Sequence, residues 1–246
     1  FEQAWRSRLP VLIKGPTGCG KTYLAQALAA AAKTDLIRLQ CFEGITEKQA
    51  IGSFDEALQR LYLETQEHVI DREWDKLRSS LHTLDFFTHG PLMQAVLQPR
   101  PVVLLIDEVD RAESEFEAFL LEILSDFQVS IPELGTLKAA HVPLVVLTSN
   151  NAREMTDALK RRCLYLNVGF PDAAREQAIV AARLPQADAQ LSAEVVRVAQ
   201  ALRGLDLKKL PSVSETLEWV RALVVLNADR LDRELCRQTW NVVLKN

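Results

Sequence analysis

Short apolar runs alternate with longer segments of helical spacing through most of the first 170 residues. Two of the longer segments, 22–33 and 115–127, are alanine-rich or repeat apolar residues at three- and four-residue intervals, as helices do. The apolar runs have the length and composition of buried strands and cover residues 10–14, 35–40, 102–106, 144–148 and 163–168. This alternation predicts an α/β fold, with a parallel five-stranded sheet and helices on both of its faces.

One long segment between the second and third predicted strands departs from this alternation. Residues 55–98 exceed a simple crossover and keep helical spacing over 56–84, with a stop around Gly90-Pro91. We therefore expect a helical insert within about 44–98.

The pattern changes twice more toward the C-terminus. Residues 128–143 place Pro132 and Gly135 between apolar stretches, which predicts a short hairpin before the fourth strand. Helical patterns without an intervening strand then lie near 172–184, 191–203, 212–227 and 231–244. We expect an α/β domain over residues 1–170 and a small all-helical lid domain over residues 171–246.

Charge and cysteine spacing narrow the class of protein. A net charge of -4 and a pI of about 5.7 provide no broad cationic field, so we expect no nucleic-acid partner. Cys19, Cys41, Cys163 and Cys236 form no Cys-x-x-Cys pair, which argues against a zinc site or a disulfide framework and fits a reducing cytoplasm. No apolar run approaches the roughly 18 residues of a membrane span and no secretory signal opens the chain. We expect a cytoplasmic protein.

A glycine-rich loop follows the first predicted strand and precedes the first predicted helix. It reads Gly15-Pro16-Thr17-Gly18-Cys19-Gly20-Lys21-Thr22 and fits the spacing G-x-x-x-x-G-K-[ST]. Such a turn directs backbone N–H groups at a phosphate chain, and the following helix presents its positive end to the anion. We expect Lys21 to contact the β and γ phosphates of ATP and the Thr22 hydroxyl to bind Mg²⁺. The alternative, a plain glycine turn, does not explain the strand-loop-helix context. The chain begins at Phe1 without an initiator Met, which is compatible with an adenine pocket partly contributed by a removed N-terminal segment.

The third predicted strand ends in two adjacent carboxylates, Asp107 and Glu108. In combination with the glycine-rich loop, Asp107 is expected to help hold Mg²⁺, and Glu108 to orient and deprotonate an attacking water. A solvated turn after the strand is the alternative.

The second and fourth predicted strands end in uncharged hydrogen-bonding side chains at the same edge of the sheet. Asn150, in the run Thr148-Ser149-Asn150-Asn151, is expected to contact the γ phosphate or the water beside it. A capping role for the following helix is a second possibility that does not exclude the first. Gln40 is a candidate hydrogen-bond partner of Glu108 when no substrate is bound.

An arginine pair, Arg161-Arg162, precedes the fifth predicted strand. An arginine that projects from this surface toward a neighbouring subunit would neutralise charge on the transferred phosphoryl group. A solvated pair is the alternative.

The order of these motifs resembles that of the AAA+ ATPases, and within them of the MoxR family. The stretches LLIDEVDRAESEFEAFLLEILSDFQVSIPELGTLKA and VVLTSNNAREMTDALKRRCLYL are especially similar to the CoxD-like branch, named for carbon monoxide dehydrogenase maturation. The resemblance covers nearly the whole chain. It implies that Asn150 is sensor 1, that Arg161 or Arg162 is the arginine finger, and that 128–143 is the pre-sensor-1 hairpin. It also implies a hexameric ring, a partner with a von Willebrand A domain, and a chaperone role in metalloenzyme activation.

The chain departs from the family where a lid arginine would act as sensor 2. The matching stretch, Leu210-Pro211-Ser212-Val213-Ser214-Glu215, contains no arginine. Either Lys208 or Lys209 substitutes, or the lid senses nucleotide through packing alone. Residues 41–56, where the family carries an insert, form either a loop facing the ring pore or a plain surface loop.

Three functions are compatible with these motifs. The first is an ATPase that remodels a protein client. The second is a scaffold whose assembly ATP regulates, with incidental hydrolysis. The third is a DNA-acting motor subunit, which the acidic balance and the lack of a DNA-binding module disfavour.

Overall fold

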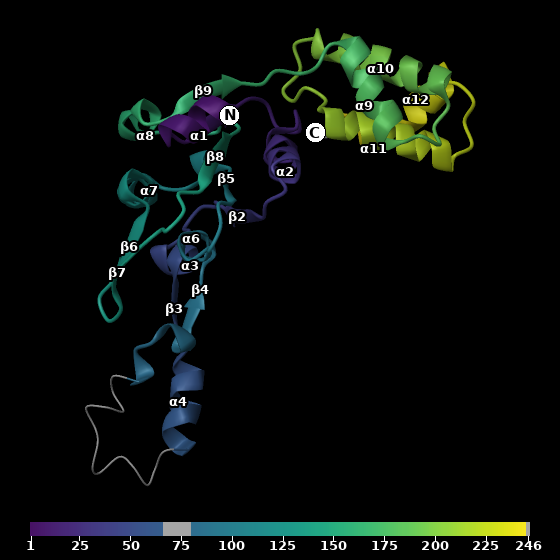
Figure 1. Ribbon diagram of the computed structural model, residues 1–246. Helices are drawn as coiled ribbons and strands as arrows, with labels where there is room; N and C mark the ends of the chain where they lie inside the picture. The colour runs from purple at the N-terminus through teal and green to yellow at the C-terminus, as the bar shows by residue number, and fades with distance from the viewer. Residues whose placement is uncertain (66–79, 245–246) are drawn as a thin grey trace, which may run out of the picture. The chain divides into compact units, whose positions relative to one another are not determined.

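The computed structural model describes residues 1–65 and 80–244, and the chain forms two compact units (Figure 1). The sheet unit comprises residues 1–14 and 22–166, and the helical unit comprises residues 15–21 and 167–246. The glycine-rich loop therefore makes most of its contacts within the helical unit. The domain boundary after residue 170 stays a prediction.

The sheet unit contains the predicted parallel five-stranded sheet, with the strand order β2-β5-β8-β1-β9. The strands are β1 Val11–Lys14, β2 Leu36–Gln40, β5 Val103–Asp107, β8 Leu144–Ser149 and β9 Leu164–Asn167. Every residue of β5 and β8 is buried, which explains why these strands read as continuous apolar runs. The predicted positions of all five strands are confirmed within a residue or two.

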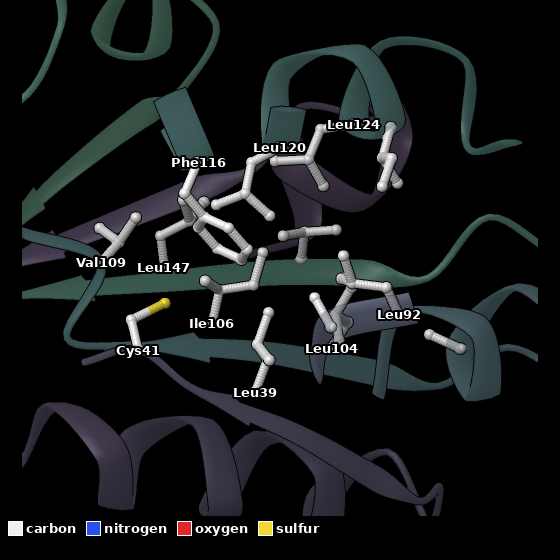
Figure 2. Packing of buried hydrophobic residues seen from close by; sticks show 14 of the residues in the cluster. Leu39, Cys41, Leu92, Leu104, Ile106, Val109, Phe116, Leu120, Leu124 and Leu147 are labelled. Carbon is white, nitrogen blue, oxygen red and sulfur yellow. The ribbon is translucent and has the colours of Figure 1, made fainter. Parts of the chain in front are cut away.

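The apolar positions of the helices in the sheet unit pack with those of the strands in one buried core. Outside the segment between β2 and β5, the helical elements of the sheet unit are α1 Glu2–Ser7, α2 Lys21–Ala31, the 3-10 turn η2 Val109–Arg111, α7 Ser114–Asp126 and α8 Asp157–Arg161. Figure 2 shows Phe116, Leu120 and Leu124 of α7 packed in the same cluster as the strand residues Ile106 and Leu147. Burial of each such side chain stabilises the fold by about 1.5–3 kcal/mol.

The segment between β2 and β5 is less helical than its spacing predicts. It contains α3 Glu47–Ile51, β3 Gly52–Phe54, α4 Glu56–Thr65, the 3-10 turn η1 Leu84–Phe86, β4 Phe87–His89 and α6 Pro91–Val96. β3 and β4 pair in antiparallel fashion, and Figure 1 shows them leading from α3 and α6 to α4. The predicted helical insert thus contains helices toward both of its ends and also a two-stranded antiparallel pair, which its spacing did not indicate. Its part over 66–79 lies outside the described residues.

Two backbone features explain this outcome. Gly52 has a φ of 120°, and a Cβ there would lie 1.9 Å from the Thr88 carbonyl oxygen, so the close approach of β3 to β4 requires glycine. Gly90-Pro91 starts α6, because proline in the first turn lacks only an N–H that has no partner within the helix.

The predicted hairpin before the fourth sheet strand is confirmed. It consists of β6 Gln128–Ile131 and β7 Gly135–Lys138, which pair in antiparallel fashion. Gly135 has a φ of 77° in the connection, a conformation that glycine adopts without steric cost.

The helical unit contains the predicted helices α9 Ala173–Arg183, α10 Ala189–Arg203, α11 Val213–Val225 and α12 Arg233–Thr239, followed by the 3-10 turn η3 Trp240–Val242. Each of the four helices begins after a side chain that accepts from a first-turn N–H, namely Asp172, Asp188, Ser212 and Asp232. Trp219 of α11 is fully buried and belongs to the apolar core of this unit. None of the helices in the described ranges combines the length and apolar character needed to cross a membrane.

A buried ion pair fixes the start of α11 within this unit. Arg203 donates to both carboxylate oxygens of Glu176 at 2.6 and 2.7 Å, and Glu176 has no exposed surface. The Arg203 Nε also donates to the Pro211 carbonyl at 2.6 Å. This guanidinium therefore holds the chain immediately before Ser212.

Candidate functional site

The carboxyl ends of three neighbouring strands bring the predicted site residues of the sheet unit together. Gln40 of β2 is in register with Asp107 of β5, and Ile106 of β5 with Leu147 of β8. The residues that follow these positions therefore lie at one edge, which is where open α/β sheets bind ligands. We call Asp107, Glu108 and Asp110 the acidic edge.

Asp107 is buried and has a polar partner on several sides. Its two carboxylate oxygens each lie 3.1 Å from the Thr22 hydroxyl, and Arg38 Nη2 donates to Oδ2 at 2.6 Å. The Thr148 hydroxyl donates to Oδ1. Arg38 compensates the charge, and the two hydroxyls satisfy the remaining acceptor positions.

Glu108 lies next to Asp107 with a backbone φ of 55°, in the left-handed region. Its N–H donates to Thr148 Oγ1 at 2.9 Å, so the hydroxyl that binds Asp107 also fixes the Glu108 backbone. Asn150 Nδ2 donates to Glu108 Oε1 at 3.1 Å. Arg111 Nε lies 3.3 Å from Oε2, and the expected contact with Gln40 Nε2 is present at 3.4 Å.

Asp110 binds the backbone that carries Asn150. It is 2% exposed, and its Oδ2 accepts from the Asn150 N–H at 3.1 Å and from the Ala152 N–H at 2.7 Å. The loop after β5 is thereby tied to the loop after β8.

The acidic edge raises the pKa of a nearby thiol. Burial first, and then the negative charges of Asp107, Asp110 and Glu108, raise the pKa of Cys41 to about 12. The same charges favour a cation at this edge.

The oxygen atoms at this edge fit Mg²⁺. The Thr22 hydroxyl and the Asp107 carboxylate are hard oxygen donors, the ligand type that Mg²⁺ prefers. In the parts of the chain that the structure describes, no group of three or more His, Cys, Asp or Glu side chains forms a metal site of its own.

The glycine-rich loop of the helical unit has the backbone shape that phosphate binding requires. Gly18 and Gly20 have φ values of 73° and 99°. Lys21 Nζ is buried and donates to the Gly15 and Pro16 carbonyls at 2.8 and 2.7 Å. The Lys21 side chain therefore folds back onto the first two residues of the loop.

The same loop packs against the first residues of α11. A Cβ at Gly18 would lie 2.4 Å from the Ser212 Cβ and 3.6 Å from the Ser214 hydroxyl. A Cβ at Gly15 would lie 2.0 Å from the Val168 carbonyl oxygen. Both glycines are thus required by close approaches within the helical unit.

Within residues 1–65 and 80–244, Lys208 and Lys209 make no hydrogen bond or ion pair with the glycine-rich loop that would replace the arginine missing from 210–215. Lys209 Nζ donates to Glu215 Oε1 at 2.9 Å, in the capping box of α11. Burial by itself raises the pKa of Glu215, but bonds from Ser212 and Lys209 outweigh it, so that the pKa is lowered. Lys209 therefore stabilises the helix start.

The structure distinguishes the two arginines before β9. Arg162 Nη1 donates to the Leu121 carbonyl at 3.2 Å and to Ser125 Oγ at 2.8 Å, near the end of α7. Arg161 is exposed and, within the described ranges, makes no hydrogen bond or ion pair. Of these two arginines, Arg161 is the one whose guanidinium is not engaged by another described residue.

Sequence reasoning missed Arg38 and Asp110. Arg38 is two residues before Gln40, so strand alternation puts both on one face of β2, a signal that was available. Asp110 offered no such signal, because its partners are backbone N–H groups of a loop distant in sequence.

Residues 10–163 match the family model described as AAA domain (dynein-related subfamily). The denitrification regulatory protein NirQ of Stutzerimonas stutzeri is 28% identical over 243 residues, and the match covers 96% of this chain and 78% of NirQ. Protein NorQ of Paracoccus denitrificans is 28% identical over 243 residues, with 96% of this chain and 80% of NorQ covered.

Among solved structures, the RuvB Holliday junction branch migration motor of Thermotoga maritima is similar, with a TM-score of 0.54 and 18% identity. The match covers 98% of this chain, which spans 65% of the RuvB chain. At this identity the likeness concerns the fold alone.

Proposed function

The chain belongs to the AAA domain family, dynein-related subfamily, and from this premise we propose that it is a MoxR-type AAA+ ATPase that hydrolyses ATP with Mg²⁺. The observation that carries the proposal is the pairing of Glu108 Oε1 with Asn150 Nδ2 at 3.1 Å, beside the contact between Thr22 and Asp107. A general base and an amide thus lie together where a water beside the γ phosphate would be activated.

In the proposed reaction, Glu108 accepts a proton from the attacking water, and the Asn150 amide orients that water or the γ phosphate. Backbone N–H groups of 15–22 bind the phosphates, and Lys21 places its charge on the β and γ phosphates. Thr22 and Asp107 would hold Mg²⁺, which neutralises charge on the phosphate oxygens when bound.

We assign the arginine finger to Arg161 and a structural role to Arg162. In a hexameric ring, Arg161 would reach the γ phosphate bound by the next subunit. Its free guanidinium supports this choice, whereas Arg162 is engaged with Leu121 and Ser125 of α7.

Glu108→Gln tests the catalytic assignment. The variant is expected to lose turnover by at least about 100-fold while it still binds a fluorescent ATP analogue. Unchanged turnover would remove Glu108 from the reaction.

Mixed oligomers test whether the finger acts in trans. Arg161→Ala and Lys21→Ala subunits are each expected to be inactive alone, and mixing them should restore part of the activity, because each supplies what the other lacks. Arg162→Ala is the matched control and should retain turnover. Absence of any restoration would contradict an active site shared between subunits.

We further propose that hydrolysis remodels a protein client, as in the CoxD-like branch, with a von Willebrand A domain partner and a metalloenzyme target. The order of motifs and the similarity to NirQ, named a denitrification regulatory protein, support this assignment. ATP turnover measured with and without a von Willebrand A protein from the same source tests it, and we expect stimulation by the partner.

A nucleotide-regulated scaffold is the second candidate. The engagement of Lys209 with Glu215, together with the absence of an arginine from the stretch 210–215, favours it, since the expected position of a cation for the γ phosphate is then not filled. A scaffold would assemble with ATP and show no turnover response to partner or client.

A further inference from the structure

We propose that Asp110 is a positioning residue for ATP hydrolysis, whose carboxylate holds the loop after β8 so that the Asn150 amide meets Glu108. This inference rests on the proposed function, because it concerns the reaction that Glu108 and Asn150 perform. It assigns a role to the third carboxylate of the acidic edge, which neither the phosphate loop nor the metal ligands use.

In the described part of the chain, all the side-chain hydrogen bonds of Asp110 lead to the loop after β8, residues 150–152. Its carboxylate accepts only backbone N–H groups, from Asn150 at 3.1 and 3.3 Å and from Ala152 at 2.7 Å. Asn151, between these donors, has a φ of 58°, so the loop takes a left-handed turn around the carboxylate. The turn determines the direction in which the Asn150 side chain leaves the backbone.

A hydrogen bond separate from those of Asp110 fixes the Glu108 backbone. The Glu108 N–H donates to the buried Thr148 hydroxyl at 2.9 Å, and Asp110 takes no part in this bond. Two separate anchors therefore set the position of Glu108 and of Asn150, and the 3.1 Å contact between Oε1 and Nδ2 depends on both. Reacting groups displaced by about 1 Å lose on the order of 100-fold in rate.

A carboxylate suits this task better than an amide. Oδ2 accepts from both backbone donors, and Oδ1 accepts a third, longer contact from the Asn150 N–H at 3.3 Å. Asn at the same place keeps an oxygen for the two donors, but it has no negative charge and puts an NH₂ group where Oδ1 accepts. Asp110→Asn is therefore nearly isosteric, and it weakens the anchor by removing the charge of the acceptor and the Oδ1 contact.

A second buried carboxylate provides a matched control. Glu117 has no exposed surface and binds the same connection farther on, through Arg153 and the Thr156 N–H at 2.8 Å. It does not contact the residues next to Asn150. Glu117→Gln therefore reports the general cost of disturbing a buried carboxylate beside this loop.

The experiment compares steady-state turnover, binding of a fluorescent ATP analogue and thermal unfolding in these variants of the full chain. Asp110→Asn is expected to lower kcat by about 10- to 100-fold, with the nucleotide Kd changed by less than about threefold. Glu117→Gln is expected to lower the Tm at least as much as Asp110→Asn and to change kcat by less than about threefold.

A double-mutant cycle separates positioning from general destabilisation. If Asp110 acts through Asn150, Asp110→Asn has no further effect on kcat once Asn150 is replaced by Ala. Losses that multiply in the double variant would overturn the proposal, as would a normal kcat in Asp110→Asn. If Asp110→Asn does not fold, Asp110→Glu, which displaces the carboxylate by one methylene, takes its place and is expected to lower kcat by at least about threefold.

The failure of this inference is distinguishable from the failure of the proposed function. Loss of turnover in Glu108→Gln with a normal kcat in Asp110→Asn would overturn only the role of Asp110. Full turnover in Glu108→Gln would overturn both.

Discussion

The acidic edge and the glycine-rich loop are held in place by different means. Asp107 and Asp110 are buried and accept bonds from hydroxyl, guanidinium and backbone groups of α2, β2, β8 and the loop after β8. The loop over 15–21 has glycines with positive φ, a lysine bonded to its own carbonyls, and close packing against Ser212. The groups proposed to activate water are thus pre-organised, whereas the groups proposed to bind phosphate rest on backbone shape and packing.

Arg203→Ala is expected to have the largest effect on stability. The loss should fall on the helical unit, which contains the glycine-rich loop. The variant leaves Glu176 buried without its cation and should lower the free energy of unfolding by about 3–5 kcal/mol, measured in urea. Arg153→Ala is the counterpart in the sheet unit, where the partner Glu117 is buried but the Arg153 side chain is 40% exposed. We expect Arg153→Ala to lower the free energy of unfolding by less than Arg203→Ala does. Equal losses would show that the two ion pairs do not differ in strength.

Lys21→Ala is expected to weaken ATP binding by at least about 100-fold, or 2.7 kcal/mol, because the phosphates lose their point charge. Binding is measured by titration with a fluorescent analogue. Lys14→Ala is the control, since the Lys14 ammonium lies over the Tyr165 ring at the end of β1. Equal weakening in both variants would indicate a general loss of positive charge.

Gly18→Ala and Gly20→Ala test the role of packing. Both positions have positive φ, but only a Cβ at Gly18 would meet Ser212, while a Cβ at Gly20 has open space. Gly18→Ala should therefore cost about 1–3 kcal/mol more in unfolding free energy. Ser212→Gly should restore part of the difference, because glycine is tolerated as an N-cap at a cost of a few tenths of a kcal/mol. Equal losses at both glycines would exclude the contact.

The smallest effect on stability near neutral pH is expected from the buried cysteine thiols, which stay protonated there. Burial raises the pKa of Cys41 and of Cys163 to about 12, so iodoacetamide at pH about 8 should modify the half-buried Cys19 and Cys236 first. Above the ordinary value of 9.0, the unfolded chain releases protons that the folded chain keeps, so stability falls as the pH rises toward about 12. Peptide mapping gives the order of modification, and early modification of Cys41 would contradict its burial.

The sheet was predictable because buried parallel strands leave continuous apolar runs, as β5 and β8 do. β3 and β4 were not, because each is only three residues long and their pairing depends on a close approach at Gly52. Local spacing does not record such a contact.

The candidate site likewise has residues that the sequence pattern predicts and contacts that it does not. Side chains at strand ends, such as Glu108 and Asn150, follow from the order of the strands, and the structure brings them within hydrogen-bond distance. The contact of Ser212 with Gly18 joins residues far apart in sequence, so no pattern indicates it. Which arginine has a free guanidinium likewise depends on the end of α7.

The path of the backbone has a mechanical consequence. The chain passes from one compact unit to the other after Lys14, after Lys21 and after Leu166. The first two of these junctions flank the phosphate loop. The backbone torsions at these two junctions belong both to the loop and to the chain that leads into the sheet unit, so a change in either of them is also a change in the loop that we propose binds phosphate.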